Sequence, residues 1–381
     1  MTERGVAFRQ WKLRRELDRI RQQLRGIPEF FIEPWQRWRH DAQRARTLEA
    51  QDGAIALRPK VALLLLFQPR GVAASTVWTC QHLVSKGYAP LIVSNAPLSA
   101  QDREALSPHV WRMTQRPNFG YDFGGYRDGI WLLNHWGVAP EVLIVLNDSI
   151  WFPLQGSETL IDRMEASQAQ FVGALQLDPL RATQGIPAKK RPFFGSFFLM
   201  AQRGAWQHPA FQAFWRHYRI TSNKYKTIRR GERGLSHALM DAGLRCEAMY
   251  TRAQLDDHMR GLDANGLREL LRDLVTIDDR LEQELAQCLN EADGSQQWRE
   301  RALQLALRIT EKQNVLATAP ITSLTRFEVP YLKKARDWNN LRALGVIEQR
   351  WQCGELPRPV EAVVREVSQT LGATRASEKL G

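Results

Sequence analysis

The 381-residue sequence has few cysteines and no long apolar run. Its four cysteines lie far apart and form no Cys-x-x-Cys pair, which argues against a zinc ribbon or a disulfide framework and favours a reducing compartment. The longest apolar stretch, residues 61–67, is too short to cross a bilayer, which takes about 18 residues. The first residues also lack the apolar core of a secretory signal. We therefore expect a cytoplasmic protein, at most peripheral at the inner face of the plasma membrane.

Acidic residues are scarce in one part of the chain. The net charge is +12, and residues 181–233 contain twelve Lys or Arg and a single acid, Glu232. Residues 1–60 contain fourteen basic and eight acidic residues, so the remainder of the chain is net negative. A positive field concentrated in this way predicts a partner that carries phosphate or presents an anionic surface.

Apolar strand-like segments alternate with helical segments from residue 60 onward. Such alternation predicts an α/β fold with a mainly parallel sheet and helices on both faces. We expect strands at residues 61–67, 90–94, 142–146, 171–175 and 197–200, and helices at 75–86 and from about 124.

Two neighbouring segments combine glycine with polar side chains. The run Asn118-Phe-Gly-Tyr-Asp-Phe-Gly-Gly-Tyr126 is a glycine-punctuated loop, and the apolar strand that starts at Val142 ends abruptly in Asn147-Asp148-Ser149. Open α/β sheets build ligand sites where strands end beside such loops. The pattern therefore predicts a site for a nucleotide and a metal ion at the tip of this strand.

These segments also resemble a known family. The phrases Asn118-x-Gly-Tyr-Asp-Phe-Gly-Gly-Tyr126 and Leu146-Asn-Asp-Ser-Ile150-x-x-Pro153 look like the signature of the rhamnan synthesis protein F family. Gly195-Ser-Phe-Phe-Leu-Met200 and Val329-Pro-Tyr-Leu-Lys333 fit more loosely. Members are glycosyltransferase-like proteins of bacterial surface-polysaccharide assembly, with a fold similar to GT-A enzymes (also described as Rossmann-like).

The resemblance implies a sugar transfer. The expected donor is a nucleotide sugar that carries a deoxyhexose, such as dTDP-rhamnose, and the expected acceptor is a glycan or lipid-linked glycan of a growing cell-surface polysaccharide or lipopolysaccharide. The family implies inversion at the anomeric carbon. Such a transfer requires that the departing diphosphate be neutralised and that the acceptor hydroxyl lose a proton.

The resemblance also assigns residues to these tasks. Asp148 is the expected catalytic ligand of Mg²⁺ or Mn²⁺, although GT-A enzymes usually place two carboxylates here and Asn147-Asp148-Ser149 offers one. Glu232 is the expected general base. The nucleotide sugar is expected at Gln68, Arg70, Asn118, Gly120, Asp122, Asn147 and Ser149, of which the first two rest on fold analogy alone. The phosphates are expected at Lys226, Arg229, Arg230, Arg233 and Lys333.

Each acid in this set also has a purely structural interpretation. Asp148 would also suit a turn or a helix cap, and Asp122 would also suit the cap of the helix that begins near Gly124. Glu232, in Arg229-Arg-Gly-Glu-Arg-Gly234, is equally suited to an ion pair with a neighbouring arginine. The sequence leaves these alternatives open.

We expect four parts along the chain. Residues 1–58 read as a basic helical extension, which either packs on the main domain or lies on anionic lipid. Residues 59–258 form the GT-A-like domain, 259–316 a helical hairpin, and 317–381 a closing segment.

Two other functions remain as alternatives. The single strand-tip carboxylate and the hairpin suit a catalytically silent scaffold in a polysaccharide assembly complex. The pI of about 9.8 suits a nucleic-acid binder. The sequence carries no recognised nucleic-acid motif, so nucleic acid is not an expected partner.

Overall fold

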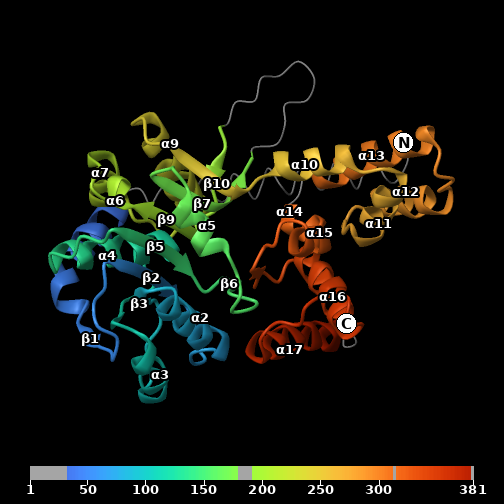
Figure 1. The fold of residues 1–381 in the computed structure, drawn as a ribbon. Coiled ribbons are helices and arrows are strands. Elements are labelled where there is room, and N and C mark those ends of the chain that lie inside the picture. Colours follow the sequence, from blue (N-terminus) through green and yellow to red (C-terminus); the bar gives the residue numbers. More distant parts are fainter. Residues whose placement is uncertain (1–31, 179–190, 312–314, 379–381) are drawn as a thin grey trace, which may run out of the picture.

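A computed structural model describes residues 32–178, 191–311 and 315–378 (Figure 1). The described chain contains a nine-stranded sheet in the order β1-β4-β3-β2-β5-β9-β7-β10, with β8 paired to β7. The strands are β1 (Ala50–Asp52), β2 (Lys60–Leu66), β3 (Tyr88–Ser94), β4 (Arg112–Gln115), β5 (Val142–Asn147), β7 (Phe171–Leu177), β8 (Phe193–Phe194), β9 (Phe198–Gln202) and β10 (Cys246–Tyr250).

The centre of the sheet is parallel. Strands β4, β3, β2 and β5 run in one direction, as does the pair β7 and β10. Strand β9 runs antiparallel between β5 and β7, and β1 is antiparallel to β4. The expected α/β fold with a mainly parallel sheet is therefore confirmed, with one expected strand, at residues 197–200, in the reverse direction.

Helices cover both faces of the sheet because the buried strands are apolar on both sides. In β2, Leu64 packs toward α2 (Ala74–Ser85) and α5 (Leu160–Ala166), whereas Leu63 and Leu65 pack toward α4 (Tyr121–His135). The second face is completed by α7 (Pro209–His217) and α9 (Gly234–Asp241), and α3 (Ala100–Leu106) follows β3. The aromatic residues of α7, Phe211 and Trp215, belong to this core.

The chain after the sheet is helical, but not as a simple hairpin. Helices α10 (Arg252–Gly261), α11 (Ala264–Asp273), α12 (Asp279–Asn290) and α13 (Gln296–Glu311) share one core and project from the sheet (Figure 1). The segment expected as a helical hairpin, residues 259–316, contains more than two helices, because the chain breaks between α11 and α12 and leaves Ile277 48% exposed. Asp278 caps α12 by accepting from the N–H groups of Arg280 and Leu281.

The C-terminal part returns to the sheet domain. After α14 (Val315–Thr318) and α15 (Pro320–Thr325), β11 (Leu332–Lys333) pairs antiparallel with β6 (Ile150–Trp151). Helices α16 (Trp338–Gln352) and α17 (Glu361–Glu378) pack on this pair. Within the described ranges, no helix has the length and apolarity needed to cross a membrane.

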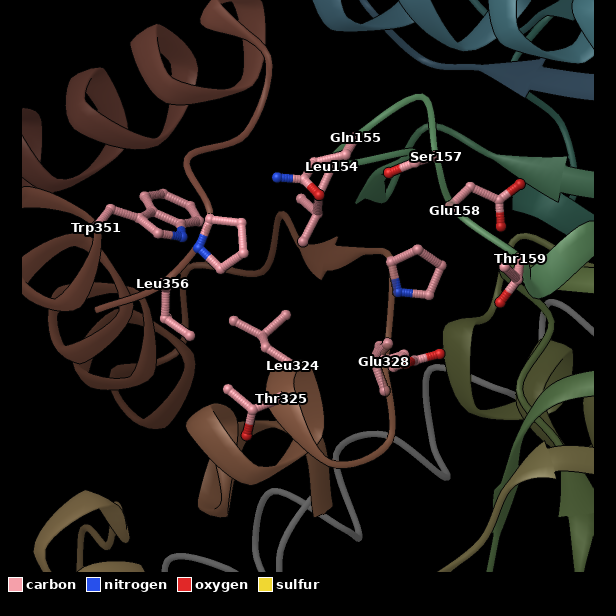
Figure 2. Close-up of a pocket in the computed structure, with 13 residues that line it drawn as sticks. Leu154, Gln155, Ser157, Glu158, Thr159, Leu324, Thr325, Glu328, Trp351 and Leu356 are labelled. Atoms are coloured by element: carbon pink, nitrogen blue, oxygen red, sulfur yellow. The ribbon is translucent and has the colours of Figure 1, made fainter. Parts of the chain in front are cut away.

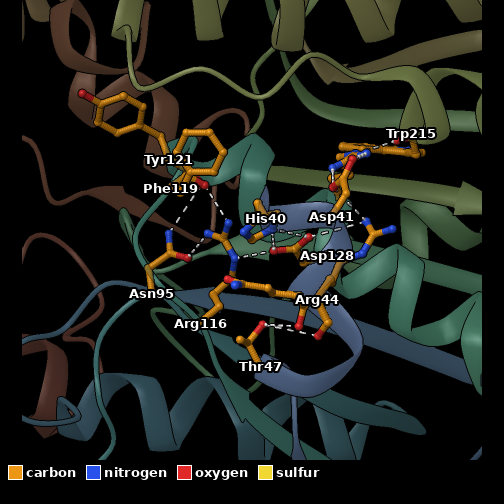
Figure 3. Close-up of polar contacts among 12 residues, drawn as sticks. His40, Asp41, Arg44, Thr47, Asn95, Arg116, Phe119, Tyr121, Asp128 and Trp215 are labelled. Atoms are coloured by element: carbon orange, nitrogen blue, oxygen red, sulfur yellow. Dashed lines mark hydrogen bonds and ion pairs between the residues drawn. The ribbon is translucent and has the colours of Figure 1, made fainter. Parts of the chain in front are cut away.

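Of the expected N-terminal extension, residues 1–31 lie outside the described residues. Residues 32–47 form a helix that lies against α4, and buried ion pairs around Asp128 attach this helix to the sheet domain (Figure 3). The Asp128 carboxylate lies 2.9 Å from His40 Nε2 and 2.6 Å from Arg116 Nε, and Arg127 pairs with Asp41 at 2.6 Å. Burial would raise the pKa of Asp128, but His40 and Arg116 outweigh it and hold that pKa below its usual value.

The same network fixes the glycine loop. Arg116 donates to the carbonyl oxygen of Phe119 at 2.6 Å and to Asn95 Oδ1 at 2.7 Å (Figure 3). Gly120 then takes a left-handed conformation, with φ +87°, and starts α4. A Cβ at Gly120 would lie 2.2 Å from Ile220, so both backbone conformation and space require glycine here.

Asp128→Asn is expected to lower the free energy of unfolding by about 3 kcal/mol, because it leaves buried cations without their counter-charge. The pKa of Asp128 is depressed in the folded state, so its stabilisation is complete above the unfolded pKa of about 4 and is lost as the pH falls below it. Urea unfolding at pH 7 measures the loss.

The matched control is Asp52→Asn, which removes an exposed ion pair with Arg112 and should cost less than about 1 kcal/mol. Equal losses in the two variants would contradict the structural role assigned to Asp128.

Candidate active site

The expected site lies where the order of the parallel strands reverses. From β2 the chain moves to β3 and β4 on one side, then crosses back to β5 on the other side. Ligands of open α/β sheets bind at the carboxyl ends of the strands beside such a switch point. Asp148 follows β5 here, and its Oδ2 accepts the backbone N–H of Phe67, just after β2, at 2.8 Å. Asp148 therefore ties the two strand ends together, and we refer to the region at these strand ends as the crevice.

Asp122 supplies the second carboxylate, which Asn147-Asp148-Ser149 lacks. It lies in the first turn of α4, where no side chain caps the helix, so the capping interpretation of Asp122 is wrong. Its Oδ2 instead accepts from Asn147 Nδ2 at 2.9 Å. Burial, together with the charges of Asp148 and Glu232, raises the pKa of Asp122 to about 6. The sequence places Asp122 26 residues before Asp148; the fold brings them into electrostatic contact.

Glu232 reaches the same place from a separate element. It lies in η2 (Ile228–Arg233), one turn of π-helix, a geometry that is frequent at functional sites. The hydroxyl of Ser196 donates to Glu232 Oε1 at 2.6 Å, and the Ser196 carbonyl accepts from the Tyr126 hydroxyl at 2.9 Å. The neighbouring arginines have other contacts: Arg230 pairs with Glu33, and Arg233 lies over the Phe193 ring. These contacts favour an oriented carboxylate over the local ion-pair alternative.

A lysine from the far end of the chain faces these acids. Lys333 lies in β11, in register with Ile150, two residues after Asp148. Its Nζ is 3.3 Å from the centroid of the Phe197 ring. Burial lowers the pKa of Lys333 to about 7, although the charges of Glu232 and Asp122 oppose this shift. At neutral pH the Lys333 amine is therefore close to half-protonated, although it lies beside carboxylates.

Lys334 is a residue that the sequence interpretation missed. Burial lowers its pKa, opposed by the charges of Glu366 and Asp148. The Glu366 carboxylate of α17 lies 3.5 Å from Lys334 Nζ, and it also accepts from Ser75 and from Trp151 Nε1. Two adjacent lysines after an apolar segment are the only sequence signal for this contact. Ser196 lies in the run Gly195-Ser-Phe-Phe-Leu-Met200, from which the sequence predicts no role for it.

The remaining expected donor residues have mixed positions. Asn147 is buried, and its Oδ1 accepts from both the backbone N–H and the hydroxyl of Ser149, so it holds the strand tip. Asn118 is exposed. Gln68 bonds to Thr76 and to the N–H of Ala73, at the start of α2, and also helps to keep the Asp148 carboxylate ionised. Arg70 is exposed and lines a separate hollow beside α17.

The expected phosphate cluster is dispersed. Lys226 and Arg230 both pair with Glu33 of the N-terminal helix, at 2.9 and 3.3 Å, and Arg229 is exposed. Of the five expected phosphate-binding residues, Lys333 is the one that the structure places beside the carboxylates. The positive run in the sequence is therefore partly neutralised within the protein.

Asp122 and Asp148 are the acids to consider as ligands of a divalent cation. Burial also raises the pKa of Asp148, opposed by the N–H of Phe67 and the charge of Lys334. The charge of Asp148 disfavours the ionised form of Asp122, which an added cation would relieve. No group of three or more His, Cys, Asp or Glu within the described ranges could hold a metal unaided. Mg²⁺ commonly binds one or two carboxylates together with substrate phosphates, so a site of that kind does not require a third protein ligand.

A second cavity lies apart from these residues. It has a volume of about 510 Å³ and opens between the segment after β6 and the C-terminal helices (Figure 2). Leu324, Trp351 and Leu356 form one wall, and Glu158 and Glu328 lie on the other side. Glu158 is held by His82 at 2.7 Å. None of the expected site residues lines this cavity.

Comparison with known proteins finds a similarity to one family. Residues 91–268 match the family model for rhamnan synthesis protein F. The matched range, slightly less than half of the chain, is similar to the rhamnan synthesis protein F family. The matched range contains Asp122, Asp148 and Glu232, whereas Lys333 follows it.

Other similarities are more distant. The uncharacterized protein y4gN of Sinorhizobium fredii is 30% identical over 260 residues, which is 68% of this chain and 66% of that protein. The chain thus spans slightly less than two thirds of that relative. Among solved structures, the glycosyltransferase GlyE of Streptococcus pneumoniae aligns with 51% of this chain and 45% of its own, at 11% identity and a TM-score of 0.30. Mannosyltransferase PcManGT of Pyrobaculum calidifontis, in complex with GDP-Man and Mn²⁺, aligns with 88% and 99%, at 10% identity and a TM-score of 0.27.

Asp122→Asn is expected to stabilise the protein in a pH-dependent manner. The folded pKa of about 6 exceeds the unfolded value, so the wild-type protein loses stability as the pH rises from about 4 to 6, and the loss persists above. The amide removes this penalty. After allowance for partial solvent screening, we expect the free energy of unfolding of the variant to exceed that of the wild type by about 1–2 kcal/mol at pH 8. At pH 4 the two values should be equal.

Urea unfolding at both pH values measures this difference, with the exposed Glu104→Gln as the control. A difference for Asp122→Asn that does not change with pH would contradict the electrostatic coupling of the three acids.

Proposed function

We propose that this protein is a glycosyltransferase that moves a sugar from a nucleoside diphosphate to a hydroxyl group of a surface glycan. The observation that carries the proposal is the meeting of Asp122, Asp148, Glu232 and Lys333 at the switch point of the sheet. These groups come from four separate segments, yet each alters the protonation of another. Similarity to the rhamnan synthesis protein F family supports the same reaction class.

In this proposal the donor diphosphate lies between the acids and Lys333. The Lys333 ammonium donates hydrogen bonds to phosphate oxygens, and binding draws a proton onto this amine, whose pKa is otherwise about 7. Asp148 and Asp122 would hold a divalent cation, which, when bound, neutralises part of the charge that the departing diphosphate carries. Asn118, which is exposed, contacts the nucleoside.

Glu232 acts as the general base. The acceptor oxygen forms a bond to the anomeric carbon of the donor while the bond from that carbon to the phosphate oxygen breaks. The electron pair leaves with the diphosphate, and the acceptor proton moves to the Glu232 carboxylate. Ser196 holds that carboxylate through its 2.6 Å hydrogen bond, which orients the second oxygen for the acceptor. Attack opposite the leaving group inverts the anomeric carbon.

The identities of the sugar and of the acceptor are proposed from the family and not from the site geometry. A deoxyhexose such as rhamnose, carried by dTDP, is proposed from the family, as is an acceptor in lipopolysaccharide or another cell-surface polysaccharide. The proposed mechanism requires a diphosphate and a hydroxyl acceptor, and applies to any such pair.

Thermal unfolding with dTDP, UDP, GDP and CDP, each with and without Mg²⁺ or Mn²⁺, tests donor binding. A nucleotide at about 100 times its dissociation constant should add about 2.7 kcal/mol of stability. We expect a shift for one nucleotide that Asp148→Asn abolishes. Glu232→Gln should keep that shift but lose sugar transfer by at least about 100-fold, because its amide cannot accept the proton.

The control for both variants is Glu104→Gln, an exposed acid on α3. A shift that Asp148→Asn leaves intact would refute the site assignment. If none of the nucleotides binds, the enzyme proposal fails, and the scaffold alternative then predicts partner proteins without nucleotide.

A further inference from the structure

The outward face of the helix over residues 32–47 is both aromatic and basic. Ile32, Trp35 and Trp38 are 46%, 55% and 66% exposed, and Arg39 and Arg46 are exposed near them. At 3.6 residues per turn these positions share one side of the helix. The Arg39 guanidinium lies 5.6 Å from the centroid of the Trp35 indole. Large exposed apolar groups gathered on one face mark an interaction surface.

The acids of this helix point the other way. Glu33 accepts from Thr221 at 2.6 Å and pairs with Lys226 and Arg230. Asp41 makes a two-pronged pair with Arg127, at 2.6 and 2.9 Å. Both carboxylates are thus neutralised by cations of the sheet domain. The charge that the helix presents outward is therefore positive.

A second short element lies against the inner side of this helix. Helix α8 (Lys224–Thr227) is held at the start of the N-terminal helix by the ion pair between Lys226 and Glu33. We call Ile32, Trp35, Trp38, Arg39 and Arg46 the aromatic-basic face.

The inner side of this helix, opposite the aromatic-basic face, lies near the glycine loop of the candidate site. Thr221, which donates to Glu33, follows Ile220, and Ile220 packs directly against Gly120. The face itself is therefore turned away from the sheet domain.

We propose that the aromatic-basic face docks the protein on an anionic lipid surface. Indole rings settle at the level of lipid headgroups, and exposed arginines are attracted to the negative charge there. The charge decides between occupants: a second copy of this chain would place the same cations opposite one another, whereas anionic headgroups neutralise them. The inference uses residues outside the proposed sugar-transfer site and does not depend on that reaction.

Sedimentation of the full chain with vesicles tests the proposal. We expect binding to vesicles that contain phosphatidylglycerol, little binding to phosphatidylcholine alone, and weaker binding at high salt. The double variant Trp35→Ser/Trp38→Ser should lower the partition coefficient at least about tenfold. Arg39→Gln/Arg46→Gln should lower it about 30-fold, since each arginine contributes separately.

The matched control is Trp338→Ser, which removes a tryptophan that is 54% exposed at the start of α16 and should leave vesicle binding unchanged. Equal binding by Trp35→Ser/Trp38→Ser, or no binding of the wild-type chain to anionic vesicles, would overturn the proposal. So would light scattering that shows a dimer which the tryptophan variant dissociates, because the face would then belong to a second copy.

The nucleotide shift described above, measured without vesicles, separates this proposal from the enzymatic one. It should be the same in the wild-type chain and in Trp35→Ser/Trp38→Ser, because neither indole belongs to the donor site.

Discussion

The buried carboxylate of Asp128 holds together the elements that surround the candidate site. Arg116 reaches it from the end of β4 and His40 from the N-terminal helix, while α4 carries Asp128 itself. A buried charge is tolerated only when its partners remain in place. The position of each element therefore depends on the others, and the glycine loop, which Arg116 holds through Phe119, inherits this rigidity.

The crevice has the opposite electrostatic character. At Asp128 the neighbouring cations outweigh the effect of burial and lower the pKa. At Asp122 burial and the surrounding acids together raise the pKa to about 6. Such an unbalanced group lowers stability and is retained where binding or catalysis requires it. The contrast within one helix, between residues six positions apart, distinguishes the structural acid Asp128 from Asp122, for which we propose a functional role, more clearly than burial alone.

Much of this arrangement could be predicted from the sequence, and the exceptions have physical causes. The strand around Leu64 and the tip at Asp148 follow from local apolar patterning, which needs no long-range information. The pairing of Asp122 with Asp148 depends on strand order, so the sequence showed one carboxylate where the fold provides two. The basic run was misleading because charge counts ignore distant partners: Lys226 and Arg230 are bound by Glu33, almost 200 residues earlier. The helix break before Asp278 was hidden by apolar residues that kept a helical spacing across it.

The contacts of Glu366 bear on how the chain can be divided. This one carboxylate on α17 joins Ser75 at the start of α2, Trp151 in β6 and Lys334 beside the crevice. A fragment that ends with the family-matched range would keep all three acids of the crevice and lose both lysines and their anchor. The family-matched range therefore lacks the two lysines that face its own acids. The C-terminal segment is thus joined to the sheet domain by these charged contacts as well as by the apolar core that α16 and α17 share with β6.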